Sequence, residues 1–182
     1  MAANNLNFRT ARLEEAEFLN DLINTTFRNT DPADVYLPGQ TNDVQIMDVD
    51  RVIASINDPS CVVLVVTDPS TPDGEPIVAH AIVHNRDEKR AWISVLAVAV
   101  EHQKRGIGGQ VIRWAEDYAR REWKKPRMEF NVLSSRAPLI AWYKGKGYEL
   151  TGESSPFVYQ YHGDWHGVLR DDLSFVNLGK DL

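Results

Sequence analysis

The fold of this chain is decided at residues 96–109, which read LAVAVEHQKRGIGG. The apolar start is typical of the end of a strand, and a polar turn then leads through closely spaced glycines into an amphipathic helix. Glycine lets the backbone approach a ligand closely, and the first turn of a helix presents unpaired N–H groups at the positive end of its dipole. The stretch therefore predicts a site for phosphate groups that needs no metal ion.

Two common phosphate-binding signatures do not describe this turn. The P-loop string GxxxxGK[ST] is absent, and the dinucleotide-binding pattern GxGxxG begins at Gly106 and Gly108 but lacks its third glycine. The pattern that remains is QxxGxG, formed by Gln103, Gly106 and Gly108 and extended by Gly109. It resembles the acyl-CoA signature of the GNAT superfamily of N-acetyltransferases.

A second stretch, AWYKGKGY at residues 141–148, is similar to the family's LYxKxGF helix end. Tyr143 stands for the tyrosine of that pattern, Lys144 follows it, and Gly147 and Tyr148 match its terminal Gly-aromatic pair. The resemblance implies that the Tyr143 hydroxyl lies near the sulfur of CoA and assists the departing thiolate. The alternative is an aromatic side chain that packs at a helix end.

The resemblance also implies a fold and a set of CoA contacts. The fold is α/β, with a mixed, twisted, mostly antiparallel sheet of about six to seven strands flanked by helices, and a splayed strand pair forms the acyl-CoA cleft. The pantetheine arm is expected along the backbone of Leu96, Ala97 and Val98. The remaining CoA contacts are expected from Gln103, Lys104, Arg105, Gly106, Ile107, Gly108 and Gly109. Arg136 stands where a CoA-contacting asparagine is frequent, and it either reaches phosphate or is an exposed loop arginine.

The sequence departs from the family pattern at the residue that takes the proton from the amine. Many family members carry a carboxylate at the position of Trp92. Ser94 shares a strand face with Trp92 by alternation, and we expect it to be a catalytic residue that holds a water molecule. Further candidates for the base are His84, Glu88, Glu129 and Glu153, which the sequence does not rank.

The reaction implied by the resemblance is transfer of an acetyl group from acetyl-CoA to a primary amine of a small molecule or peptide. A catalytically silent acyl-CoA-binding or regulatory module is one alternative, because Trp92 replaces the carboxylate, and a protein N-terminal or lysine acetyltransferase is another. Four aromatic residues either line the acceptor pocket, lie on the surface or form a homodimer contact: Tyr36, Tyr159, Tyr161 and Trp165.

Composition limits the class of protein. The chain has 182 residues, of which 43% are hydrophobic and 25% charged, and this is typical of one globular domain spanning residues 1–182. A net charge of −6 argues against nucleic acid as a partner. No apolar run approaches the ~20 residues of a membrane helix, and no secretory signal is evident. We therefore expect no membrane association and a cytoplasmic location, with the nucleus as the alternative.

Metal and thiol chemistry are not expected either. His80 and His84, like His162 and His166, are spaced by four residues but lack a third ligand, so no metal site is predicted. Cys61 lies in a β-branched run and is interpreted as a buried strand thiol.

Hydrophobic periodicity and turn residues predict the order of the elements along the chain. Strands are expected at 6–12, 61–67, 76–85, 91–98, 128–133 and 172–178, with the start of a further strand at 148–151, and helices at 13–27, 41–56, 108–123 and 137–144.

Overall fold

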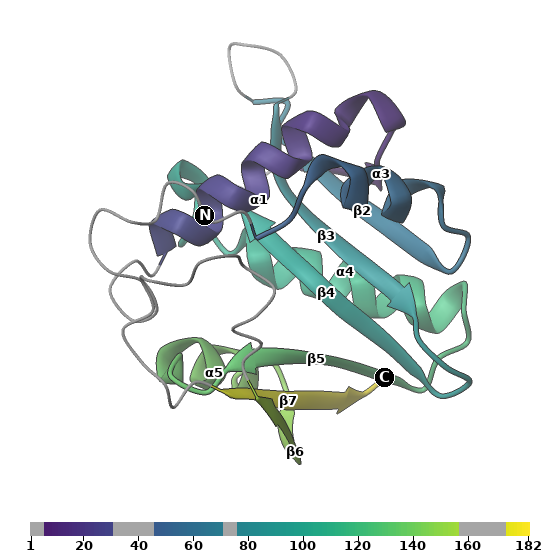
Figure 1. Cartoon of the computed structure of the whole chain (residues 1–182), viewed down its shortest axis with the longest axis vertical. Helices are drawn as coiled ribbons and strands as arrows, with labels where there is room; N and C mark the ends of the chain where they lie inside the picture. Colours follow the sequence, from purple (N-terminus) through teal and green to yellow (C-terminus); the bar gives the residue numbers. More distant parts are fainter. Residues whose placement is uncertain (1–5, 31–45, 71–75, 157–173) are drawn as a thin grey trace.

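The computed structural model describes residues 6–30, 46–70, 76–156 and 174–182 (Figure 1). Its sheet has seven strands in the order β1-β2-β3-β4-β5-β7-β6. The strands are β1 (Asn7–Thr10), β2 (Cys61–Thr67), β3 (Ile77–Asn85), β4 (Arg90–Val98), β5 (Arg127–Leu133), β6 (Glu149–Pro156) and β7 (Ser174–Asp181). Among the described strands, only the pairing between β4 and β5 is parallel. The mixed, mostly antiparallel α/β fold predicted from the sequence is confirmed.

Helices cover both faces of the sheet (Figure 1). They are the short 3₁₀ turns η1 (Leu13–Glu15) and η2 (Val100–His102) and the α-helices α1 (Ala16–Thr30), α3 (Val49–Asn57), α4 (Ile107–Arg121) and α5 (Ala137–Lys144). Leu19 of α1 and Val52 of α3 pack with Ile82 on one face. Val111 of α4 packs with Ala81 in the core on the other face. We call these the α1/α3 face and the α4 face.

β4 and β5 pair only over their first residues. Arg90, Ala91 and Trp92 lie opposite Arg127, Met128 and Glu129, and no later residues of these two described strands are paired with each other. Figure 1 shows the two strands close together at their starts and diverging toward their ends. We call the divergence between residues 93–98 of β4 and 130–133 of β5 the splay. It confirms the splayed strand pair expected from the sequence.

A bulge in β4 lies next to the splay. Val95 is opposite Ile82, and Ile93 is opposite the next β3 residue, Val83, so Ser94 is the extra residue of β4. An extra residue bends its strand and changes the direction of its side chain. The bulge therefore sets the direction of Ser94 just after β4 separates from β5.

The helix predicted over 41–56 starts later than expected. Residues 41–45 lie outside the described residues, and the helix that contains Ile56 begins at Val49. The Asp48 side chain caps it by accepting a hydrogen bond from the Arg51 N–H at 2.8 Å. The Asn24 amide accepts from the Ile46 N–H at 2.7 Å and donates to the Met47 carbonyl at 2.9 Å. The backbone before Asp48 is thus bonded to α1 and does not extend the helix.

The last strand ends later than predicted, and the strand predicted to start at 148–151 continues past these residues. β6 continues to Pro156 because its second half pairs with the start of β7, where Ser154 lies opposite Val176. β7 runs to Asp181 because β5 pairs with it along its whole length. Alternation within one strand cannot reveal such pairing between distant segments.

Gly179 of β7 lies beneath the guanidinium of Arg127, which bonds Glu129 and Asp181 at 2.6 Å each. A Cβ on Gly179 would meet the guanidinium carbon at 2.8 Å. Because Glu129 is buried and depends on this guanidinium, we expect Gly179→Ala to lower the free energy of unfolding by about 1–3 kcal/mol, as overpacking does. Urea unfolding measures the change.

The Arg127→Ala background is the control for this prediction, because it removes the atoms that the new methyl group would meet. The added loss from Gly179→Ala should nearly vanish there, as a double-mutant cycle reports. An equal loss in both backgrounds would show that Arg127 is not the cause.

Candidate active site

The turn before α4 holds two residues in the left-handed conformation. Lys104 has φ +59° and Gly106 has φ +81°, and Gly106 is the N-cap of α4 without a side chain to bond its first N–H groups. Consecutive N–H groups in such a turn form a concave site for anions. The first turn of α4 contains no acidic residue, so the positive end of its dipole stays available to an anion.

Two side chains from around α5 approach the same helix end. A Cβ on Gly108 would contact the Trp142 ring at 3.5 Å and the Val98 side chain at 3.7 Å. A Cβ on Gly109 would meet the Lys146 ammonium nitrogen at 3.3 Å. Trp142 and Lys146 are not predicted as site residues from the sequence, because no local pattern indicates that the end of α5 meets the start of α4. Lys146 adds a cation beside the exposed Lys104 and Arg105.

Gln103 connects the turn to the end of β4. Its side-chain N–H donates to the Val98 carbonyl at 3.0 Å, and the Thr26 hydroxyl donates to the same carbonyl at 3.4 Å. In this structure the Gln103 side chain therefore fixes the strand end. Its predicted contact with CoA stays a prediction.

Successive residues of β4 direct their backbone N–H and C=O groups alternately toward β3 and toward the splay. The Ala99 N–H donates to the Val78 carbonyl at 2.9 Å, and hydrogen-bonded pairs alternate along an antiparallel ladder. From the register, Ala97 directs its backbone groups toward His80 of β3. Leu96 and Val98 direct theirs to the other side, toward the splay. Of the three residues predicted to bind pantetheine, Leu96 and Val98 thus have the suitable direction.

Tyr143 lies on the α4 face beside these groups. Its side chain is buried in the same core cluster as Val98 and packs on Phe130 of β5, with ring centroids 4.3 Å apart. Burial raises the pKa of Tyr143 to about 12, and the positive charge of Arg136 acts in the opposite direction. The phenol therefore keeps its proton at neutral pH and is able to donate it. Arg136 is the N-cap of α5, the helix that carries Tyr143 near its other end.

Ser94, the predicted catalytic residue on β4, is exposed and hydrogen-bonded to His84 of β3 at 2.9 Å. The structure thus brings together two residues that are separate candidates in the sequence. Trp92, at the position of the expected carboxylate, has the Arg86 guanidinium over its ring at 4.0 Å.

The other carboxylates proposed as bases lie in different settings. Glu129 is buried between Arg90, at 3.3 Å, and Arg127, at 2.6 Å. Glu153 of β6 accepts a hydrogen bond from Asn177 at 3.0 Å, and Glu88 is exposed in the turn between β3 and β4. Because both arginines pair with the Glu129 carboxylate, we interpret Glu129 as a structural residue and not as the base.

The candidates for metal or thiol chemistry are the buried His80 and Cys61, which is half-buried rather than buried as predicted. His80 is fully buried, its ring nitrogens have no hydrogen-bond partner among the described residues, and burial lowers its pKa to about 4. Burial also raises the pKa of Cys61 to about 11. Within the described ranges, no three His, Cys, Asp or Glu side chains form a group that suits a metal ion. The remaining candidates lie outside the described residues: Tyr36, Tyr159, Tyr161, His162, Trp165 and His166.

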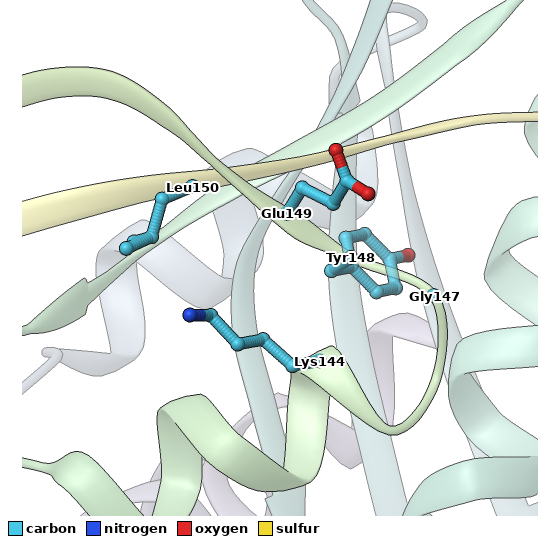
Figure 2. A pocket seen from close by; sticks show the side chains of 5 residues that line it. All are labelled: Lys144, Gly147, Tyr148, Glu149 and Leu150. Carbon is cyan, nitrogen blue, oxygen red and sulfur yellow. The ribbon is translucent and has the colours of Figure 1, made fainter.

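A pocket of about 430 Å³ lies between the end of α5 and the start of β6. Its lining residues are Lys144, Gly147, Tyr148, Glu149 and Leu150. Figure 2 shows Lys144 extending from α5 toward Leu150 on β6. None of the lining residues belongs to the splay or to the turn before α4, so this pocket is separate from the candidate active site.

In the described parts of the chain, no helix combines the length and the apolar character needed to cross a membrane.

Comparisons with known proteins agree with this geometry. The model of the acetyltransferase (GNAT) family matches residues 18–148, and no curated protein sequence matches the chain. YncA from Salmonella typhimurium, a putative acetyltransferase solved with acetyl-CoA, is 19% identical, covers 98% of this chain and 94% of its own, and has a TM-score of 0.68. NAA60 from Arabidopsis thaliana, solved with a bisubstrate analogue, is 15% identical. The match covers 97% of this chain and 99% of NAA60, with a TM-score of 0.72. A variant of the spermidine N-acetyltransferase SpeG from Vibrio cholerae is 14% identical. The match covers 97% of this chain and 94% of SpeG, with a TM-score of 0.68. At these identities the likeness shows the fold.

Proposed function

The chain belongs to the acetyltransferase (GNAT) family, and on that premise we propose that it transfers the acetyl group of acetyl-CoA to a primary amine of a small molecule or peptide. The observation that supports this most is the meeting of three elements at Gly108. The end of β4, the start of α4 and the end of α5 contact one another there through Val98 and Trp142. This meeting supports a function that uses the turn before α4, the splayed strand and the phenol of Tyr143 next to Trp142 together.

Each part of the thioester substrate has a matching protein group. The pyrophosphate suits the N–H groups of the turn at 104–109, with Lys146 as a further cation. The pantetheine amides suit the backbone of Leu96 and the N–H of Val98, which point toward the splay as an edge strand does. The Val98 carbonyl already accepts from Gln103 and Thr26. The acetyl carbonyl then lies near the Val98 N–H, a fixed donor for the charge that develops on oxygen.

The chemistry is direct attack by the neutral amine on the thioester carbon. The new C–N bond forms, the C–S bond breaks, and its electron pair leaves with sulfur. Tyr143 donates its proton to the departing sulfur and regains one from solvent. The nitrogen loses one proton in the same reaction, so that amine and thioester give amide and thiol.

The test has two parts, binding and turnover. Calorimetry with acetyl-CoA and with CoA should give dissociation constants in the range of ~1 µM to 1 mM that is usual for substrates. Thiol release is then measured over a panel of polyamines, aminoglycosides, peptides with free N-termini and lysine peptides. Absence of binding to either CoA species would overturn the proposal.

A catalytically silent acyl-CoA-binding module is the second candidate, because Trp92 stacked under Arg86 occupies the place of the usual carboxylate. Tight binding of acetyl-CoA without thiol release on any amine would favour it. Turnover on peptides alone would instead identify a protein N-terminal or lysine acetyltransferase.

A further inference from the structure

Ser94 and His84 form a hydrogen-bonded pair at the point where β4 leaves β5. The last β4 residue paired with β5 is Trp92, and Ser94 follows two residues later as the bulge residue. Its hydroxyl lies 2.9 Å from Nε2 of His84. We infer that this pair accepts the proton that the amine loses during acetyl transfer, an assignment that rests on the function proposed above.

The pair lies on the opposite face of the sheet from Tyr143. His84 shares a strand face with Ile82, two residues earlier, and Ile82 belongs to the core under α1 and α3. Tyr143 belongs to the core under α4. A thioester in the splay is therefore reached by a proton acceptor from one face and by a proton donor from the other. This arrangement suits a reaction in which the nitrogen enters and the sulfur leaves on opposite sides.

The surroundings keep the His84 imidazole able to accept a proton. Burial lowers the pKa of His84, and the negative charge of Asp58 partly opposes this. The groups across from it on neighbouring strands are Cys61 of β2 and Trp92 of β4, and Arg86 covers the Trp92 ring. Cys61 keeps its proton because burial raises the pKa of this thiol to about 11, so among the described residues Asp58 is the charge that acts on the imidazole.

The exposed Ser94 hydroxyl connects the substrate to the half-buried imidazole. As the C–N bond forms, the hydroxyl accepts the proton of the nitrogen and passes its own proton to Nε2 of His84. The imidazolium then releases that proton to solvent. Tyr143 supplies the proton that sulfur takes, so each proton has a defined source and destination.

Two substitutions and one matched control test the assignment. Ser94→Ala and His84→Gln should each lower kcat about tenfold at pH 7, less than the ~10²–10⁴ typical of general acid–base catalysis, because solvent still accepts the proton. Their affinity for acetyl-CoA in calorimetry should stay unchanged. Ser94→Thr should recover most of the rate, and Ser154→Ala on the far edge strand β6 should behave like wild type.

The pH profile separates a proton acceptor from a residue that only supports the strand. The value of kcat/KM per neutral amine should rise with pH through the pKa of His84 in the free enzyme, below the usual value near 6.5. Asp58→Asn removes the charge that raises this pKa and keeps an oxygen for the Ser60 hydrogen bonds. It should shift the rising limb to lower pH, and the NMR titration of the His84 ring should shift equally.

The outcomes distinguish this inference from the function on which it rests. If wild type binds no CoA species or acetylates no amine, the proposed function fails and the proton-accepting pair falls with it. If wild type acetylates an amine but Ser94→Ala and His84→Gln keep its rate and its pH profile, only the pair is refuted. Loss of the rising limb of the pH profile in both variants, with acetyl-CoA affinity retained, supports the pair as the proton acceptor.

Discussion

Tyr143→Phe should lower the kcat of thiol release by ~10² to 10³-fold, within the range of general acid catalysis, while the dissociation constant of CoA stays close to that of wild type. Phenylalanine keeps the ring that packs on Phe130 and removes only the proton donor. A group that acts on the departing sulfur contributes in the transition state, so its loss appears in kcat and kcat/KM equally. Stopped-flow detection of free thiol measures the rate.

The pKa of Tyr143 adds a second expectation. Burial raises it to about 12, so the phenol stays protonated well into alkaline solution. The rate difference between wild type and Tyr143→Phe should therefore be constant from about pH 6 to pH 10, because a group titrates only near its pKa. A difference that falls to about half by pH 10 would indicate a phenol with the ordinary pKa near 10 and contradict the burial that the structure shows.

Tyr118→Phe is the matched control. Tyr118 lies in the last turn of α4, at the opposite end of the helix from the turn at 104–109, and packs edge-on against Trp123, with 5.2 Å between ring centroids. Its hydroxyl has no part in the proposed chemistry, so this variant should retain wild-type turnover. An unchanged rate in both variants would remove Tyr143 from the mechanism.

Local patterns predicted the central part of this fold well. The run from Leu96 into Gly109 combines an apolar strand with a glycine turn and an amphipathic helix, and each of these signals lies within a few residues. β4 and α4 accordingly begin and end close to the predicted positions. The splay was inferred from the family resemblance, because strand periodicity does not indicate where a neighbouring strand separates.

The features that sequence reasoning missed depend on contacts between distant segments or on unusual backbone angles. Lys104 adopts a left-handed conformation that its residue type rarely prefers. Lys146 reaches Gly109 only because α5 packs against α4. Ser94 and His84 meet across a strand pair. Asn24 holds the segment before α3, which moved the start of that helix relative to the prediction.

Glu116→Ala should produce the largest loss of stability, because Glu116 is the centre of a buried polar network. This carboxylate of α4 is 5% exposed, accepts from the Tyr148 hydroxyl at 2.9 Å and pairs with Lys180 of β7 at 2.9 Å. Burial, followed by the Glu116 charge, raises the pKa of Tyr148, so this hydroxyl remains a donor. Removing the carboxylate leaves a partly buried ammonium and a buried phenol without their acceptor.

The expected loss is about 3–5 kcal/mol, the range for breaking a buried ion pair by removing one partner. At about 2–4 °C per kcal/mol for a chain of this size, the melting temperature should fall by roughly 10 °C. Tyr148→Phe removes a single hydrogen bond and should lower the free energy of unfolding by only about 1–2 kcal/mol. Calorimetric melting and urea unfolding together measure these changes.

The double variant Glu116→Leu with Lys180→Met separates the loss of the ion pair from the burial of an unpaired charge. Replacing both partners by apolar residues of similar volume is often neutral, so the double variant should recover most of the stability that Glu116→Ala loses. A double variant as unstable as the single one would show that the network itself stabilises the packing. Because Tyr148 also packs on Phe130, at 4.7 Å between ring centroids, and Phe130 supports Tyr143, that second outcome would couple the stability of α4 to the position of the proton donor.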